Sequence, residues 1–329
     1  MSFIFRRIIP SGKQVPLIAA LLIVYFVWGT TYHALNVAMQ TMPPLLMNGA
    51  RFLLAGAVML GLARWKGLAW PSLEQWRHSA LIGGLMAFGA MGLVVLAQKM
   101  GIGSGLMATV VTTMPMWLAL WTRWGGEHVP ATSWLGLVLG VAGAAVLALE
   151  GDFSATWLGA LFAFGAPLCW SLGSYASRKL SLPGPAMASA AQWLTGGAIG
   201  LLVAVLFEPA THTWQIGQTS VASWGAWGYL VVMGTLVTLN AYLWLLKNSS
   251  AALASSYSFV NPVVALWVGV ALGGEVLTGQ VFIALPLILL ALALIVYGQP
   301  LWRRLGPPLS RLGRRIQRLT RTRHPAAHP

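Results

Sequence analysis

Two stretches of the chain, 148 residues apart, share the pattern that decides the fold. Lys99 to Glu127 reads KMGIGSGLMATVVTTMPMWLALWTRWGGE, and Lys247 to Glu275 reads KNSSAALASSYSFVNPVVALWVGVALGGE. Each stretch begins at a lysine, carries a proline at its middle (Pro115, Pro262) and ends in Gly-Gly-Glu. Similarity at a fixed offset indicates two copies of one structural unit.

The amino-acid composition indicates whether these two copies fold in water or in a membrane. Of 329 residues, 57% are hydrophobic and only 8% are charged, whereas an average soluble domain is about 25% charged. A water-soluble fold could not cover its surface with so few charges, which excludes soluble enzymes and solvated scaffolds. The 37 glycines and 17 tryptophans fit close helix packing and interfacial anchoring in a membrane.

Apolar runs of the length that crosses a bilayer define the expected helices. There are ten, at about 16–36, 44–63, 79–98, 102–122, 131–149, 155–177, 184–207, 223–246, 250–273 and 278–298. Because each copy holds five spans, an odd number, the second copy enters the membrane from the opposite side. We therefore expect an all-α polytopic membrane protein whose ten transmembrane helices form two inverted five-helix repeats, 16–149 and 150–298, flanked by segments 1–15 and 299–329.

The positive charges set the orientation. With a cytoplasmic N-terminus, 18 of the 20 lysines and arginines fall on the inner side, leaving Lys99 outside and Arg51 within a span. This asymmetry predicts that both termini are cytoplasmic. The net charge of +14 is then explained by topology and predicts no nucleic-acid partner.

The basic C-terminal segment has two open interpretations. Within 309–319, leucines and an isoleucine recur at helical spacing with arginines on the other faces, which favours an interfacial helix bound to anionic lipid. Gly313 and the pair Pro307–Pro308 weaken that helix, so a disordered basic tail is the alternative.

Several motifs resemble one transporter family. They are Trp28-Gly-Thr-Thr-Tyr32, the run Pro43 to Phe52, Asn240-Ala-Tyr242, the run Ser256 to Val264, and Gly273-Gly-Glu275. In this order they are similar to the EamA family of the drug/metabolite transporter superfamily, and most similar to its bacterial inner-membrane exporters, which implies that the chain lies in a bacterial inner membrane. The resemblance implies a central cavity lined mainly by helices 1, 3, 4, 6, 8 and 9, and export of small organic metabolites, amino acids or drugs.

Polar and aromatic residues inside spans are the candidate substrate-binding residues, because such groups are costly in lipid unless they face the bundle interior. They are Tyr25, Trp28, Thr31, Tyr32, Thr113, Trp170, Ser174, Asn240, Tyr257 and Asn261. Trp28 and Trp170 hold matching places in spans 1 and 6 and would stack on a small amphipathic solute. For Trp28 the alternative is helix packing and interfacial anchoring.

Four residues are candidates for coupling or gating. Pro115 and Pro262 each remove a backbone donor in mid-span, and the imidazole of His33 is a candidate proton carrier. Arg51 could bind a carboxylate, although we favour a structural role for it. No Asp or Glu lies inside a span, so facilitated diffusion stands beside proton coupling.

Other classes of protein fit less well. A lipid-linked carrier flippase would need a cationic lateral groove, and an integral-membrane enzyme would need a catalytic constellation that the sequence does not offer.

With one cysteine, Cys169, and no P-loop or His/Cys cluster, we expect no intrachain disulfide, metal or cofactor. The Gly136-xxx-Gly140 and Gly196-xxx-Gly200 motifs predict close helix packing, with a dimer face as the weaker alternative, so the chain is expected to be a monomer or dimer.

Overall fold

The computed structural model describes residues 14–102, 110–148 and 157–273, together with Met107 and parts of 279–298. All regular structure in these residues is helical. The first half contains α2 (Gln14–Ala38), α3 (Pro44–Trp65), α4 (Leu73–Gly83), η2 (Gly84–Ala90), α5 (Met91–Lys99), α7 (Met114–Trp124) and α8 (Ala131–Ala148). The second half contains α9 (Trp157–Lys179), α10 (Pro185–Phe207), α11 (Pro209–Thr213), η3 (Ile216–Gln218), α12 (Val221–Tyr229), η4 (Leu230–Val237), α13 (Thr238–Asn248), α14 (Ala251–Ser255) and α15 (Tyr257–Gly273).

Three predicted features lie outside the described residues. They are the basic segment 309–319, the first positive charges Arg6, Arg7 and Lys13, and the repeat end at Glu275. The expected span 278–298 is described only in part.

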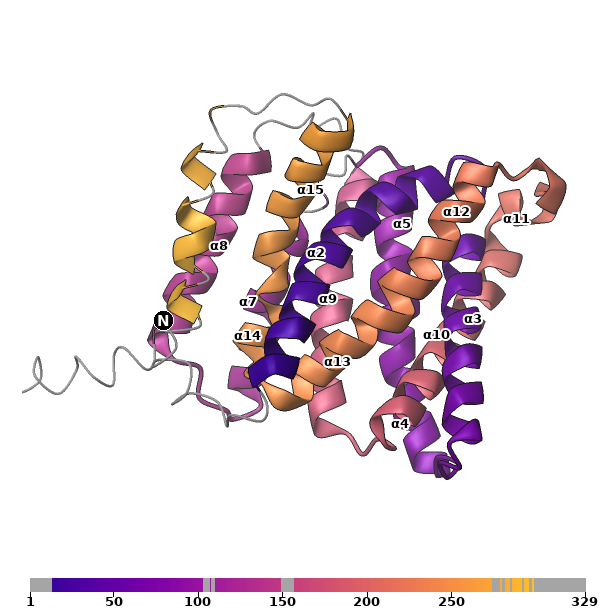
Figure 1. Ribbon diagram of the computed structural model, residues 1–329, viewed down its shortest axis with the longest axis horizontal. Helices are drawn as coiled ribbons and strands as arrows, with labels where there is room; N and C mark the ends of the chain where they lie inside the picture. The colour runs from indigo at the N-terminus through magenta and orange to yellow at the C-terminus, as the bar shows by residue number, and fades with distance from the viewer. Residues whose placement is uncertain are drawn as a thin grey trace, which may run out of the picture.

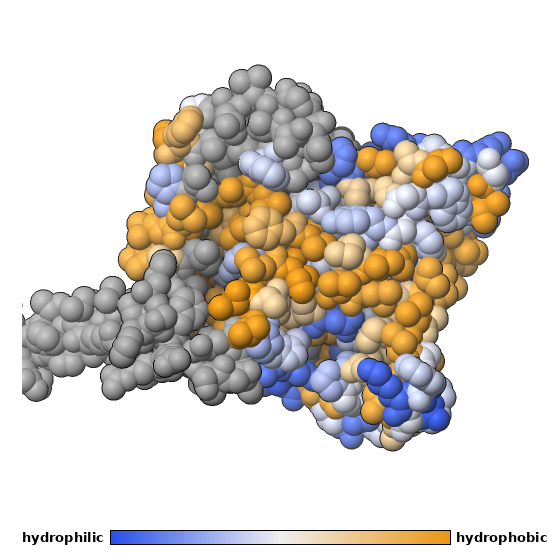
Figure 2. All heavy atoms as spheres, viewed as in Figure 1, coloured by the Kyte–Doolittle hydropathy of each residue, from blue (hydrophilic) through white to orange (hydrophobic). Residues whose placement is uncertain are grey.

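Six helices of the described chain are long and apolar enough to cross a membrane. They are Val15–Ala38, Pro44–Trp65, Leu73–Lys99, Trp157–Lys179, Pro185–Phe207 and Val221–Asn248. Each coincides with a span expected from the sequence; the third begins earlier because Ser72 and Gln75 form a capping box before Leu73. Figure 2 shows a hydrophobic belt between hydrophilic residues at two opposite edges of this face, as a bilayer requires.

Helix α2 lies at the centre of the arrangement. In Figure 1 it runs diagonally across the bundle, with α15 on one side and the continuous run of α12, η4 and α13 on the other. Helices α3 and α10 form the far edge of the bundle, where they pack tightly together.

The α3–α10 contact depends on glycine. A Cβ added at Gly56 would overlap the backbone nitrogen of Leu194, and one at Gly197 would overlap that of Leu53. The predicted packing motifs act in the same way: a Cβ at Gly196 would overlap the carbonyl of Gly83, and one at Gly140 would meet the Phe259 ring. These motifs serve packing within the chain.

Two of the long helices contain a widened, π-helical segment. η2 interrupts the run from Leu73 to Lys99, and η4 interrupts the run from Val221 to Asn248. Shifting Gly84–Ala90 by the 148 residues of the sequence repeat gives 232–238, which overlaps η4. Such segments are often found at functional sites, and no pattern in the sequence predicted them.

The predicted proline sites differ from each other in structure. Pro115 lies in the first turn of α7, directly after a turn at Thr112–Thr113, where its missing N–H costs least. Pro262 lies inside α15, and the break in that segment falls earlier, at Ser256 between α14 and α15.

Candidate functional site

A cavity lies in the bundle where both halves of the chain meet. Its volume is about 60 Å³, room for only a few water molecules. The first half contributes Trp28, Thr31, Tyr32, Leu35, Arg51, Ala90, Met91, Val94, Val111 and Met114. The second half contributes Ala166, Pro167, Trp170, Leu239, Tyr257 and Asn261. The cavity is therefore mostly apolar, with a few polar groups, as small-molecule sites usually are.

Four buried aromatic rings form one cluster at this cavity. The centroid of the Trp28 ring lies 5.4 Å from that of Trp170, 5.2 Å from that of Tyr242 and 4.6 Å from that of Tyr257. Tyr242 also lies within 5.7 Å of Trp170 and 5.4 Å of Tyr257. The edge-to-face geometry of several pairs is favourable beyond simple area burial, so the four rings pack as one unit, of which Trp28, Trp170 and Tyr257 line the cavity.

The Trp28 ring is fixed in place by the widened helix η4. Its Nε1 donates a hydrogen bond of 3.2 Å to the carbonyl of Gly234. Arg51 is held by the same turn, because its Nε donates to the hydroxyl of Thr235 at 2.7 Å. Thr235 in turn donates to the carbonyl of Leu230, five residues back, as π-helical geometry allows.

Asn261 and Thr31 line the cavity but are already engaged. With its amide oriented to satisfy both groups, the Asn261 nitrogen donates to the backbone carbonyls of Tyr25 and Tyr257, at 3.1 Å each. The Thr31 hydroxyl donates to the carbonyl of Trp28 at 2.7 Å. Asn261 therefore joins α2 to α15, a role that the sequence did not indicate.

Six of the ten predicted binding residues line this cavity: Trp28, Thr31, Tyr32, Trp170, Tyr257 and Asn261. Two more, Tyr25 and Ser174, lie outside the lining and form side-chain hydrogen bonds near it. The Tyr25 hydroxyl lies 2.7 Å from that of Ser256, and Ser174 Oγ lies 2.8 Å from the Tyr242 hydroxyl.

The remaining predicted residues lie elsewhere. Thr113 donates to the carbonyl of Val110 in its own chain segment. Asn240 does not line the cavity: its Nδ2 donates to the carbonyl of Leu236 at 2.6 Å, and Ser189 donates to its Oδ1. Of the four coupling or gating candidates, Arg51 lines the cavity; Pro115 and Pro262 do not, and His33 is exposed.

Sequence reasoning missed Tyr242 and the η4 residues that hold Trp28 and Arg51. One signal was present for them: Thr235, Leu239 and Tyr242 fall at i, i+4 and i+7, which is one face of a helix.

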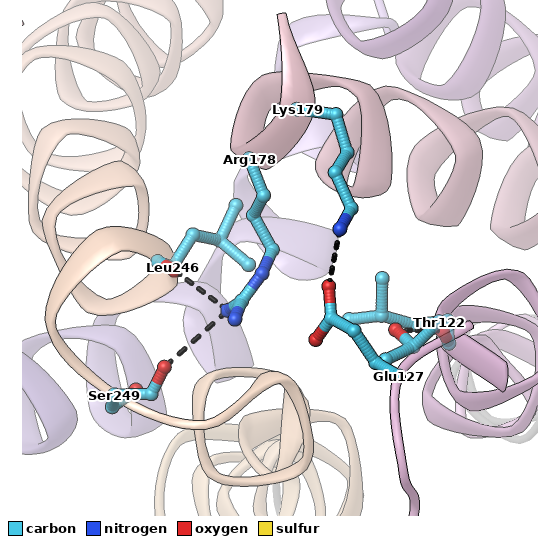
Figure 3. Close-up of polar contacts among 7 residues, drawn as sticks. Thr122, Glu127, Arg178, Lys179, Leu246 and Ser249 are labelled. Atoms are coloured by element: carbon cyan, nitrogen blue, oxygen red, sulfur yellow. Dashed lines mark hydrogen bonds and ion pairs between the residues drawn. The ribbon is translucent and has the colours of Figure 1, made fainter. Parts of the chain in front are cut away.

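Charged groups join three helices at one end of the bundle (Figure 3). Lys179 Nζ, at the end of α9, lies 2.6 Å from Glu127 Oε1, which follows α7. Arg178 Nη1 donates to the carbonyls of Leu246 in α13 and Ser249 just beyond it, at 2.7 and 3.3 Å. The hydrogen bond from Lys179 lowers the pKa of Glu127 below its ordinary value, so this carboxylate is ionised at neutral pH.

The chain matches one family model twice, over residues 15–149 and 157–297; the model is that of the EamA-like transporter family. This chain belongs to that family. It is therefore a membrane transporter by family.

Named relatives and a solved structure agree with this membership. "Uncharacterized inner membrane transporter YedA" of Escherichia coli (strain K12) is 34% identical over 290 residues, which cover 88% of this chain and 94% of that protein. A "Probable amino-acid metabolite efflux pump" of Salmonella typhimurium is 29% identical, covering 84% of this chain and 93% of that protein. A protein of known crystal structure shares the fold with a TM-score of 0.69 at 22% identity, over 87% of this chain and 97% of that one.

Proposed function

We propose that this EamA-like chain exports small organic metabolites, amino acids among them, across the bacterial inner membrane by alternating access. The observation that carries the proposal is the cavity itself, which is built from both halves of the chain around the Trp28–Trp170 contact. Sites between structural repeats are where secondary transporters bind their substrates. The relative described as a probable amino-acid metabolite efflux pump supports amino acids as one substrate class.

The proposed architecture is ten helices in two inverted repeats, with both termini cytoplasmic. Contacts across the bundle support this architecture. Segments that the charge asymmetry assigns to the same side of the membrane contact each other in the structure. On the proposed outer side, the Glu208 carboxylate accepts from the backbone nitrogens of Leu45 and Leu46, at 3.0 Å each. On the proposed inner side, Glu127 pairs with Lys179.

In this orientation the described conformation is closed toward the cytoplasm. The residues of α2 that line the cavity begin at Trp28 and continue toward Ala38, at the outer end of the helix. The aromatic cluster lies on the cytoplasmic side of the cavity, and the Glu127–Lys179 pair lies beyond the cluster on the same side. Because ligand pockets usually measure about 300–1,000 Å³, the rings must move apart to admit a metabolite. Alternating access would open this closure as the outer side closes.

Transport by purified protein in proteoliposomes tests the proposal. Vesicles loaded with an unlabelled amino acid should take up the same radiolabelled amino acid by counterflow, and protein-free vesicles should not. A panel of neutral and aromatic amino acids, with a lipophilic cation as comparison, should include at least one transported solute. If none of these solutes moves faster than in protein-free vesicles, the proposed function is wrong.

A further inference from the structure

Arg51 is an unpaired cation buried beside the cavity. Its side chain is 1% exposed, and its Nη1 has no hydrogen-bond partner among the described residues. The guanidinium carbon lies 4.7 Å from the centroid of the neighbouring Phe52 ring. The only hydrogen bond that the described residues provide for Arg51 is the one from Nε to Thr235.

No acidic side chain neutralises Arg51 within the described residues. The only ion pair there is Lys179–Glu127, at the end of the bundle. Glu74 lies in the first turn of α4, and Glu208 caps the first turn of α3. A buried charge without a counter-ion is strongly unfavourable, so a structural role alone does not explain a cation at this place.

The surroundings position this cation for a ligand. Arg51 and Trp28 are bonded to consecutive residues of η4, Thr235 and Gly234. Gly234 allows this close approach, because a Cβ at this position would lie 3.3 Å from Thr31 Cγ2, a tight contact, and 3.8 Å from Arg51 Nη2. The guanidinium is thus held at one fixed edge of the cavity next to an aromatic wall.

We propose that Arg51 binds the carboxylate of the transported substrate, and that the substrate class is carboxylates with an apolar or aromatic body, zwitterionic amino acids included. This inference rests on the proposed function. A guanidinium matches a carboxylate in geometry as well as charge, and the rings of Trp28, Trp170 and Tyr257 fit an apolar body. An α-ammonium would meet aromatic faces, which attract cations.

A cleft on the proposed cytoplasmic side of the bundle fits the same substrate class. This cleft, of about 310 Å³, is lined by Ser177, Arg178, Leu180, Leu182, Leu246 and Lys247. Its lining carries two cationic side chains and no acidic one, and the nearby Glu127 is paired with Lys179, so the cleft favours a carboxylate over a cation.

A carboxylate and its matched amide test the inference. Phenylalanine, phenylpropionate, phenylalaninamide and tetraphenylphosphonium are compared for inhibition of counterflow and for their effect on the thermal stability of the purified protein. For the wild type we expect both carboxylates to bind at least tenfold more tightly than the amide and the lipophilic cation. Arg51→Gln should abolish this preference, Arg51→Lys should keep part of it, and Arg64→Gln, at an exposed position of the same helix, should keep all of it.

Different outcomes separate this inference from the proposed function. If the wild type transports solutes but binds the amide as tightly as the acid, the inference is wrong and the exporter stands. Equal loss of acid and amide binding in folded Arg51→Gln would make Arg51 a structural residue. Stabilisation by sodium chloride that equals stabilisation by phenylalanine would show an inorganic anion site, which also contradicts the inference. A wild type that moves no solute at all overturns the exporter itself.

Discussion

At Asn261 a single amide nitrogen joins two helices. It donates to the carbonyl of Tyr25 in α2 and to that of Tyr257 in α15, while the side chain also faces the cavity. Its neighbours Trp28 and Tyr257 belong to the aromatic cluster. The amide therefore sets the distance between the two helices that carry these rings.

Asn261→Leu should destabilise the protein. Removing the donor leaves two buried carbonyls without this partner, a change that costs about 1–3 kcal/mol. Thermal unfolding in detergent measures it, and the midpoint should fall. A variant with unchanged thermal stability but no substrate binding would show instead that the amide acts on the substrate.

Individual residues of the site were predictable where their spacing along the sequence places them on one helical face or at matching positions of the repeat. Trp28 and Tyr32 share a helical face, and Trp170 occupies the matching place in the second half, so their convergence follows from the repeat. Asn240 could not be placed in this way, because only the fold shows that its amide bonds to Leu236 and Ser189. For Arg51 the sequence favoured a structural role. A sequence cannot show whether a buried cation has an acidic partner, so only the structure could suggest a ligand-binding role.

Among the described elements, α3 and α10 have the most extensive contact, because glycine removes side chains at their crossing. A Cβ added at Gly56 would overlap the backbone of Leu194, whereas a Cβ added at Gly61, in the same helix, would meet no neighbouring atom within 4 Å. The two positions form a matched pair for testing this packing.

Gly56→Ala should destabilise the protein and Gly61→Ala should not. Overpacking costs about 1–3 kcal/mol, whereas at Gly61 alanine gains helix propensity. Thermal unfolding of both variants compares them. Equal midpoints would mean that the α3–α10 contact is loose enough to absorb a methyl group.

The ion pair at the end of α9 provides a second test at this scale. Because the hydrogen bond from Lys179 lowers the pKa of Glu127, the pair stabilises the closed arrangement above the ordinary carboxyl pKa. That contribution is lost only as the pH falls below about 4. Glu127→Lys should increase hydrogen exchange of the backbone around 177–182, and Glu127→Lys with Lys179→Glu should restore protection. If the double variant exchanges as fast as the single one, the pair does not hold this end closed.

The elements themselves were predictable where length and apolarity suffice, as for the six long helices. The widened segments η2 and η4 were not, because the extra residue in a π-helical turn is stabilised by tertiary contacts such as those of Thr235 and Trp28. The loss of a backbone donor was predicted at both Pro115 and Pro262, whereas the turn at Thr112–Thr113 and the break at Ser256 were not predicted.

For the whole molecule, the distribution of charge bears on energy coupling. Within the described residues, the acidic side chains lie at helix ends and none lines the cavity. Proton-driven transporters commonly use buried carboxylates.

We therefore expect transport without obligatory proton antiport, or else coupling through His33. Counterflow should survive collapse of the pH gradient, and His33→Gln should remove any pH dependence that is found. Uphill efflux that requires a pH gradient and stays dependent on it in His33→Gln would contradict this expectation.

The central claim is that substrates pass between the two halves beside the aromatic cluster. Counterflow of a transported amino acid by Trp170→Ala, set against Trp157→Ala in the same helix α9, tests it most directly. Trp170 is buried in the cluster, whereas Trp157 is 78% exposed at the end of its helix. Losing an aromatic partner costs about 0.5–1.5 kcal/mol beyond lost area, so folded Trp170→Ala should bind substrate several-fold more weakly while Trp157→Ala transports like the wild type. Normal transport by folded Trp170→Ala, or an equal loss in both variants, would contradict the account.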